Sequence, residues 1–338
     1  MKKIKKLITV AVCAVMMVNI STTYTFAEET AKKVYLGGQP FGVKFYNDGL
    51  IVVELEEFFD GAKYVCPAKE GGLKVNDIIK EINQNPVKTN EEMQNLTINS
   101  GGKPINFTVE RNGQRKNIVV NPVKNTAGMY LLGAWIRDSC AGIGTISYYD
   151  ESQNYFAALG HGICDNDTGA LLPLGSAEIV KANISSVTKS VDGKAGSLNG
   201  YFGDEELGTL TENSDLGIYG TAENVNYKDY PLLEIADFSE IKKGEAEIYT
   251  TINGENTESY TVEITKICNS DAGSNENFVI KITDESLLDG CGGIVQGMSG
   301  SPIVQNNKLI GAVTHVFLNN TTEGYGVAAQ FMVSNYEQ

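Results

Sequence analysis

The sequence predicts a mostly β protein in which a small α/β domain precedes a larger all-β domain. From residue 129 to the C-terminus, short apolar or alternating runs follow one another with glycines between them. That spacing is typical of an all-β barrel or a pair of barrels. Between residues 34 and 123, similar runs flank one helical segment, and no long amphipathic helix or internal repeat is evident in the sequence.

Length and composition fit two folded domains. The chain has 338 residues, of which 42% are hydrophobic and 20% charged, so a sizeable core is expected and global disorder is not. A net charge of −15 argues against nucleic acid as a partner and against binding an anionic membrane through a basic surface. Two histidines and no CxxC spacing give no reason to expect a metal site, and no cofactor is predicted. The cysteines after the N-terminal segment are expected to act mainly as small buried side chains: Cys66, Cys140, Cys164, Cys268 and Cys291.

Residues 1–27 have the pattern of an export signal. Four lysines precede the apolar run 7–18, and Thr25 and Ala27 offer a small-residue cleavage site. The apolar run has 12 residues, whereas a membrane span usually needs about 20. We therefore expect an exported protein with a cleaved signal peptide. An uncleaved anchor, with membrane association through the N-terminus, is the alternative.

The first predicted domain covers residues 34–123. Asn112-Gly113 between two alternating runs is a strong hairpin signal. Asn90 is placed to cap a helix that runs from Glu91 to about Leu96. The strands expected here are 34–45, 51–55, 105–111 and 114–120.

Two motifs in this domain resemble PDZ domains of the bacterial protease type. One begins Pro67-Ala68 and continues through Gly72-Leu73 to Asp77-Ile78; the other is Ile82-Asn83 followed by Pro86-Val87. The resemblance implies a groove in which an extended peptide adds to a sheet edge. By the same resemblance, the glycine-rich entry to the domain would bind the peptide's carboxylate through Gly37, Gly38, Phe41, Gly42 and Val43. The alternative is a PDZ fold that serves only as an internal clamp.

The stretch 292–304 predicts a serine nucleophile. Ser299 lies between Gly297 and Gly300, and Pro302 ends the turn. Small neighbours let a hydroxyl stand clear of its backbone and let successive N–H groups converge as an oxyanion hole requires. The pattern resembles the nucleophile loop of chymotrypsin-like peptidases. Ser301 is the second candidate nucleophile, and an ordinary glycine-rich turn is the alternative.

A serine nucleophile needs a base that titrates near neutral pH, and histidine fits best. His161 follows an apolar strand and is flanked by Gly160 and Gly162, where a barrel would present a catalytic group. His315 lies inside an apolar strand, 16 residues after Ser299, and its reach does not exclude it. We favour His161 because mid-strand histidines are more often wall or core residues.

The carboxylate that would orient the base is not fixed by the residues alone. Each of five aspartates has an alternative role as a helix cap or turn residue. The candidates are Asp165, Asp167, Asp215, Asp284 and Asp289.

Longer motifs resemble the stage IV sporulation protein B (SpoIVB) peptidases of endospore-forming bacteria. They are the stretches 136–145, 159–168, 282–284, 292–302, 310–317 and 324–327. The resemblance implies a chymotrypsin-like double β-barrel over residues 129–338. It places the nucleophile on Ser299, the base on His161 and the orienting aspartate on Asp284. The oxyanion hole falls on the backbone N–H groups of Gly297 and Ser299.

The same resemblance implies an exported serine endopeptidase in sporulation signalling. Such enzymes act between the forespore and mother-cell membranes, cut themselves, and cut the extracellular part of a membrane-bound regulator, which leads to sigma factor activation. The PDZ domain would bind the target or the protein's own N-terminal region. A catalytically inactive PDZ scaffold at the forespore membrane and a degradative trypsin-like protease are the alternatives.

Overall fold

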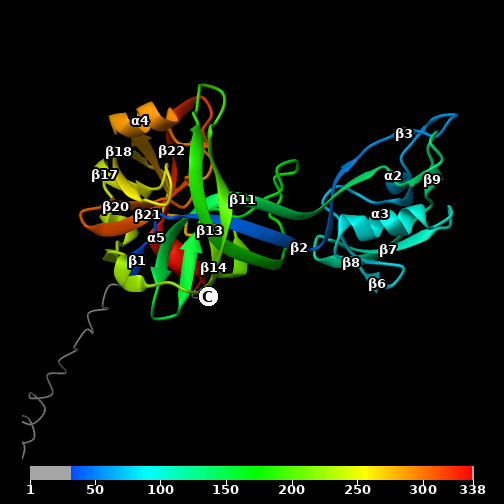
Figure 1. The fold of residues 1–338 in the computed structure, drawn as a ribbon, viewed down its shortest axis with the longest axis horizontal. Helices are drawn as coiled ribbons and strands as arrows, with labels where there is room; N and C mark the ends of the chain where they lie inside the picture. The colour runs from blue at the N-terminus through cyan, green and yellow to red at the C-terminus, as the bar shows by residue number, and fades with distance from the viewer. Residues whose placement is uncertain (1–31, 337–338) are drawn as a thin grey trace, which may run out of the picture. The chain divides into compact units, whose positions relative to one another are not determined.

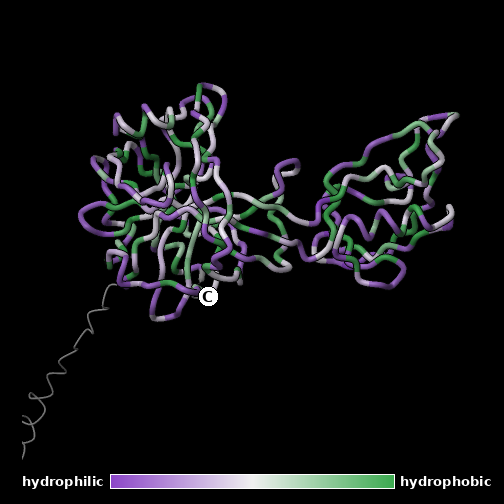
Figure 2. Tube along the Cα trace, in the orientation of Figure 1, coloured by the Kyte–Doolittle hydropathy of each residue, from purple (hydrophilic) through white to green (hydrophobic). Residues whose placement is uncertain are grey.

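The computed structural model describes residues 32–336, so the predicted signal peptide or anchor at 1–27 lies outside the described residues. Most described residues lie in β-strands, and Figure 1 shows them with the few helices. Hydrophobic segments alternate with hydrophilic ones along the strands (Figure 2). Among the described residues, no helix is long and apolar enough to cross a membrane.

The first barrel is formed by six antiparallel strands that pair in a closed ring. In ring order these are β2 (Pro40–Leu55), β11 (Ala134–Asp150), β12 (Tyr155–Ala158), β15 (Gly217–Ala222), β14 (Ser197–Ser214) and β13 (Leu174–Thr188), which pairs again with β2. Its interior is apolar and includes Phe41, Ile146, Phe156, Ile179 and Ile218. Closing the ring removes the exposed strand edges that an open sheet would present.

The second barrel is also a closed ring of six antiparallel strands. In ring order they are β17 (Gly244–Thr250), β18 (Glu258–Ile267), β19 (Phe278–Ile282), β22 (Asn320–Ala328), β21 (Lys308–Phe317) and β20 (Pro302–Gln305), which pairs back to β17. Helix α4 (Glu285–Cys291) and the nucleophile stretch connect β19 to β20, and helix α5 (Ala329–Tyr336) follows β22. The strand pairing thus confirms the double β-barrel.

Two short strands join the barrels. β1 (Lys33–Leu36) pairs with β11 of the first barrel and with β16 (Leu232–Ile235), which in turn pairs with β21 of the second. A separate apolar cluster fills this junction, with Val34 and Leu36 from β1, Tyr148 from β11, Leu309 from β21 and Met332 from α5. Two 3-10 turns, Tyr227–Asp229 and Phe238–Glu240, lie on either side of β16.

The small α/β domain is inserted between the first two strands of the first barrel. β2 pairs with barrel strands up to Asn47 and with β5 (Ile78–Ile82) from Leu50 onward, and β11 re-enters the barrel at Ser139. We call residues 48–138 the inserted domain. Besides β5 it contains β3 (Phe58–Phe59), β4 (Tyr64–Val65), α2 (Pro67–Gly71), β6 (Asn85–Pro86), α3 (Asn90–Ile98), β7 (Ile105–Arg111), β8 (Gln114–Val120), β9 (Val123–Lys124) and β10 (Tyr130–Leu131).

This arrangement differs from the predicted boundaries of 34–123 and 129–338. Residues 33–47 lie in β1 and in the barrel part of β2, so the strand pairing assigns them to the double barrel. Two separate strands were expected within 34–45 and at 51–55. The structure instead has one continuous strand, β2, that covers parts of both ranges and passes through Gly49 at φ 112°. Local sequence shows where a strand can form but not which partners it takes along its length.

Local signals within the inserted domain are largely as expected. Asn112 and Gly113 both adopt positive φ, as the two-residue turn between β7 and β8 requires. Helix α3 begins one residue earlier than predicted, because Thr89 is its cap in place of Asn90. The Thr89 hydroxyl accepts from the N–H of Glu92, whose carboxylate accepts from the N–H of Thr89. This reciprocal pair satisfies two helix-end donors at once.

Candidate active site

Ser299 stands in a loop held open by two glycines in left-handed conformations. Gly297 has φ 100° and Gly300 has φ 93°, values that favour glycine. A Cβ on Gly300 would lie 2.0 Å from the carbonyl oxygen of Thr145 and 2.5 Å from the nitrogen of Leu159. The loop of the second barrel therefore packs directly on β11 and on the end of β12 in the first.

Thr145 of β11 fixes the backbone on both sides of Met298. Its N–H donates to the carbonyl of Ser299 over 3.0 Å, and its hydroxyl donates to the carbonyl of Gly297 over 2.7 Å. The N–H groups in the same two peptide units are bonded as well, that of Met298 to the Val295 carbonyl and that of Gly300 to the Val313 carbonyl. Within residues 32–336, the N–H groups of Gly297 and Ser299 donate to no protein acceptor, as the predicted oxyanion hole requires.

His161 comes from the first barrel, directly after β12. Leu159 and Gly160 before it have φ of 67° and 68°, two successive left-handed residues that turn the chain sharply at the strand end. Leu159 is not glycine, so its backbone stores strain at this point. A Cβ on Gly160 would lie 3.0 Å from the Thr314 methyl group and 3.3 Å from the Val313 carbonyl oxygen. The turn thus places His161 against β21 of the second barrel.

Ser299, His161 and His315 meet around Thr314. The Ser299 hydroxyl donates to the Thr314 carbonyl over 2.9 Å. The rings of His161 and His315 lie 4.9 Å apart between centroids, tilted by 32°. The structure thus brings together the predicted nucleophile, the predicted base and the second histidine considered.

The hydrogen bonding of His161 fixes its tautomer. Its Nδ1 lies 2.8 Å from the carbonyl oxygen of Gly162, which can only accept, so Nδ1 carries the proton and Nε2 the lone pair. Burial lowers the pKa of His161 to about 4, with a smaller lowering from His315, and the bond to Gly162 opposes that change. Burial also lowers the pKa of His315. In this state His161 is neutral at physiological pH and can accept a proton at Nε2.

Asp284 does not orient His161 in this structure. It is the N-cap of α4, and its Oδ1 accepts from the N–H groups of Ser286 and Leu287 and from the Ser286 hydroxyl. Its Oδ2 accepts a longer bond, 3.4 Å, from the N–H of Thr261. The Ser286 hydroxyl and these backbone donors lower the pKa of Asp284. In this structure the Asp284 carboxylate serves a helix end, and its role as the orienting aspartate stays a prediction from the resemblance.

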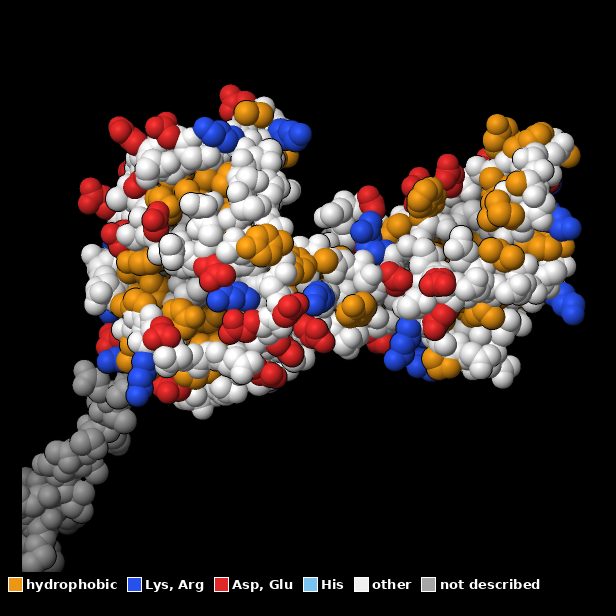
Figure 3. Space-filling view, in the orientation of Figure 1, with side chains coloured by type: hydrophobic (Ala, Val, Ile, Leu, Met, Phe, Trp, Pro, Cys, Tyr) orange, Lys and Arg blue, Asp and Glu red, His pale blue; other side chains and the backbone are white. Residues whose placement is uncertain are grey.

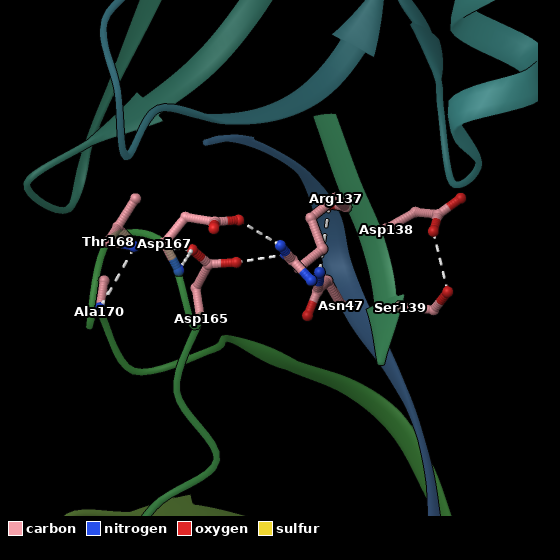
Figure 4. Close-up of polar contacts among 8 residues, drawn as sticks. All are labelled: Asn47, Arg137, Asp138, Ser139, Asp165, Asp167, Thr168 and Ala170. Atoms are coloured by element: carbon pink, nitrogen blue, oxygen red, sulfur yellow. Dashed lines mark hydrogen bonds and ion pairs between the residues drawn. The ribbon is translucent and has the colours of Figure 1, made fainter. Parts of the chain in front are cut away.

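The structure also shows the surroundings of Ser301 and of the four other candidate aspartates. Ser301 is fully buried, so it is not exposed to a substrate. Asp165 and Asp167 both contact Arg137 of β11, and Figure 4 shows the guanidinium pointing between them. Asp289 lies on α4. Asp215 occupies an exposed turn between β14 and β15.

The residues predicted to bind a peptide carboxylate lie elsewhere. Gly37 and Gly38 donate backbone bonds to β11, Gly42 lies in the barrel part of β2, and Phe41 and Val43 belong to the core of the first barrel. Buried in a barrel, these five residues cannot form a peptide loop. The inserted domain instead has a cavity of about 470 Å³ beside α3, lined by Met93 and by the segment 130–136.

No group of three or more potential metal ligands gathers in the described part of the chain. The five cysteines in that part are unpaired. Cys66 and Cys291 are buried, as expected for small apolar side chains, whereas Cys164 is exposed and Cys140 and Cys268 are half-buried.

Sequence reasoning missed Thr145, Arg137 and Thr314 as parts of the site. All three stand within stretches that carry the family resemblance, yet their roles depend on contacts between strands that are distant in sequence. Their position within those stretches is the one feature of the sequence that could have pointed to them.

Comparison with known proteins identifies the family of this chain. The family model of the SpoIVB peptidase S55 matches residues 128–333, and that of the PDZ domain matches residues 42–121. The chain belongs to the SpoIVB peptidase S55 family. It carries a PDZ domain, which is the inserted domain described above.

Individual relatives are more distant. The probable protease eep of Enterococcus faecalis is 36% identical over 67 residues, which is 20% of this chain and 16% of that protein. The match thus spans about a sixth of that relative. Among solved structures, the Rv3671c protease of M. tuberculosis in its active form is 13% identical with a TM-score of 0.36, covering 59% of this chain and 74% of that one. The HtrA-type protease AlgW with a decapeptide is 11% identical with a TM-score of 0.33, covering 60% and 53%.

Proposed function

We propose that this member of the S55 family is a serine endopeptidase with Ser299 as nucleophile and His161 as base. The observation that carries the proposal is the meeting of the two residues between the barrels, with the lone pair of His161 on Nε2. A serine without an adjacent base is a weak nucleophile, so this pairing is what the chemistry requires.

The reaction is acyl transfer. The Ser299 hydroxyl rotates away from the Thr314 carbonyl and attacks a peptide carbonyl while Nε2 of His161 takes its proton. The N–H groups of Gly297 and Ser299 hold the oxyanion that forms. His161 then protonates the leaving amine, and water activated by the same histidine hydrolyses the acyl-enzyme.

The substrate binds as an extended strand. β21 pairs with β20 only as far as Ala312, and with β22 on its other edge up to Phe317. The first edge is therefore open beyond Val313, next to Ser299, among the described strands. A peptide added there would make backbone bonds to the strand and present its carbonyl to the nucleophile. We therefore expect the enzyme to cut unfolded or extended segments rather than folded domains.

We further propose that the enzyme is exported and acts in sporulation signalling, where it cuts itself and the extracellular part of a membrane-bound regulator. The family membership and the predicted signal peptide support this role. The PDZ domain would hold the target or the protein's own N-terminal region in the cavity beside α3. Met93→Arg should then weaken binding of such peptides without changing serine labelling, and unchanged peptide binding would contradict this use of the cavity.

The catalytic proposal is tested with the purified full-length protein. Mass spectrometry over time should show fragments of the chain from wild type and from Ser301→Gly, and none from Ser299→Ala. A fluorophosphonate probe should label Ser299 in the same two active proteins. Fragments from Ser299→Ala, or a wild type that neither cuts nor reacts with the probe, would contradict the proposal.

The sporulation role is tested in the host. Replacement of the chromosomal copy with Ser299→Ala should block late sigma factor activity and spore formation while the protein is still made. Normal sporulation in that strain would contradict the sporulation role. The peptidase would then have a different physiological role.

A further inference from the structure

The cavity of the inserted domain lies between a helix and a free strand edge. α3 contributes Met93 and Thr97 to this space of about 470 Å³, and the segment 130–136 lines its other side. We call it the α3 groove. Residues 134–136 pair with β2 along one edge, and no strand among the described residues pairs with their other edge. A free edge offers backbone N–H and C=O groups, so the groove can take a peptide in extended conformation.

The charged side chains that line the α3 groove are all carboxylates. Glu56 and Glu57 line it and are exposed, and no lysine or arginine is among the described residues around it. Neither glutamate forms an ion pair within residues 32–336. α3 adds Glu91 and Glu92 in its first turn and has no basic residue along its length. Carboxylates without counter-charges disfavour an acidic ligand and favour a cationic one, so the groove is complementary to a basic segment.

The helix end beside the groove already has acceptors on its N–H groups. Asp138 Oδ2 accepts from the N–H of Asn90 over 2.9 Å, and the Thr89 hydroxyl accepts from that of Glu92 over 3.2 Å. A helix N-terminus attracts anions through such donors, and here the chain's own side chains occupy them. A ligand carboxylate would therefore meet occupied donors at this helix end and no basic side chain in the groove.

An exposed indole adds a surface for a cation. Trp135 lines the groove and is 57% exposed, and its indole N–H donates to the Glu56 carboxylate over 2.7 Å. This bond holds an aromatic face and a negative charge side by side, so one cation can contact both. The Tyr130 ring is already covered by the ammonium group of Lys124, 5.1 Å from its centroid, and Lys124 itself does not line the groove. Trp135 is therefore the ring that is open to a cation from a ligand.

We propose that the α3 groove binds an extended segment of a protein partner that carries a lysine or arginine. The cationic group lies over Trp135 and beside Glu56 and Glu57, the backbone pairs with the free edge of 134–136, and an apolar side chain of the segment contacts Met93. This inference rests on the proposed use of the cavity as the peptide site of the PDZ domain and names the chemistry of what it binds. A peptide recognised by its free C-terminal carboxylate is the competing ligand.

Binding is measured with the full-length Ser299→Ala protein, so that no peptide is cut. The probes are seven-residue peptides of alternating threonine and leucine, blocked at both ends, that differ only in a central lysine, glutamine or glutamate. A fourth peptide has the central glutamine and a free C-terminal carboxylate. Trp135 is the only tryptophan of the chain, so its fluorescence reports on the groove directly. Titration calorimetry on the same samples measures the affinity independently of the fluorescence.

The lysine peptide should bind about 5-fold to 20-fold more tightly than the glutamate peptide at low salt, and high salt should reduce this ratio because the carboxylates are exposed. Glu56→Gln combined with Glu57→Gln should abolish the preference and keep the binding of the glutamine peptide, since an amide oxygen at position 56 still accepts from Trp135. Glu70→Gln is the matched control. It removes an exposed carboxylate of the same domain, on α2 and outside the groove, and should keep the preference.

Three results would overturn the proposal: equal affinities for the lysine and glutamate peptides, tightest binding by the peptide with the free carboxylate, or no binding of the lysine peptide. Peptides that bind without a charge preference, and that Met93→Arg weakens, would overturn this inference alone and leave the cavity as the peptide site. Binding that Met93→Arg does not change would contradict the use of the cavity itself. None of these outcomes depends on fluorophosphonate labelling of Ser299 in the wild type, which tests the peptidase proposal.

Discussion

Thr145 is a buried threonine whose hydroxyl and N–H hold the two carbonyls around Met298. Thr145→Val keeps the shape and the N–H but removes the bond to Gly297, leaving that carbonyl free to turn. In the proposed mechanism the N–H of Gly297 supplies half of the oxyanion hole, so we expect kcat to fall by about 10-fold to 100-fold, less than direct loss of an oxyanion donor. Steady-state kinetics on an excised peptide substrate measures this change. Thr145→Ser is the matched control and should keep most of the rate; equal activity in both variants would show that the hydroxyl is not needed.

His161 links stability to pH. Burial keeps it neutral in the fold, with a pKa of about 4, while the unfolded chain has an ordinary value near 6.5. Below pH 6.5 the unfolded state binds the proton more readily, so the stability present at neutral pH is lost as the pH falls toward 4. The full loss from this group would be about 3 kcal/mol. Denaturant unfolding between pH 7 and pH 4 measures it, and His161→Gln should show a flatter profile through the same window.

Asp284 shows what residues alone could and could not decide about the site. Its sequence context, an aspartate before Glu285 and Ser286 at a strand end, fits a helix cap as well as a catalytic role. The loops of Ser299 and His161 were recognisable in the sequence because both residues have glycines nearby on either side, and the structure brings the two loops together. A carboxylate partner has no such local mark, because its role depends only on which strand ends the fold brings together.

The β11 strand and the loop after His161 are joined by one buried ion pair. Arg137 contacts Asp165, whose side chain is fully buried, and also Asp167, whose side chain is 61% exposed (Figure 4). Asp165 Oδ1 further accepts from the N–H groups of Asp167 and Thr168. These contacts fix the loop four residues beyond His161, the proposed base.

Arg137→Gln should therefore leave a buried carboxylate without its counter-charge and lower the free energy of unfolding by about 3 kcal/mol or more. Asp167→Asn removes only the exposed partner and should cost less than about 1 kcal/mol. Chemical denaturation distinguishes the two. Similar small losses in both variants would show that Asp165 does not depend on Arg137 for its stability.

β2 marks the limit of prediction for the fold. The sequence predicted one strand that ends at Phe45 and another that begins at Ile51, and both lie in β2. The sequence did not show that one strand serves two cores, with Phe41 and Phe45 in that of the first barrel and Leu50 and Val52 in that of the inserted domain. Hydrophobic pattern fixes which face of a strand is buried but not which neighbour buries it.

The inserted domain has its own core, which includes Leu50, Leu73, Ile79, Phe107 and Val109. Hydrophobic side chains also appear on its surface in Figure 3. Phe59 and Tyr64 are among the exposed hydrophobic residues of this domain. Its two connections to the barrel leave from adjacent positions, because Tyr46 and Ser139 are paired across β2 and β11. Such neighbouring ends allow a domain to be removed with a short turn in its place.

Replacing residues 48–138 with a two-residue Asn-Gly turn should therefore give a folded double barrel that still reacts with fluorophosphonate at Ser299. Circular dichroism and probe labelling check this outcome, with Ser299→Ala in the shortened chain as the control for specific labelling. An unfolded product, with the separately expressed inserted domain also unfolded, would show that the two cores depend on each other.

The position of the insertion also constrains the order in which the chain folds. The first barrel cannot pair β2 with β11 until the whole inserted domain has been made, and closing an unstructured loop of that length is entropically costly. Once the inserted domain folds, its own pairing of β2 with β11 brings the barrel strands into register. We expect pulse-labelling hydrogen exchange to protect Val52 and Val109 before Phe41 and Ile146. The peptide-binding domain would thus be the template on which the catalytic domain assembles, and an enzyme built this way becomes active only after its recognition module is complete.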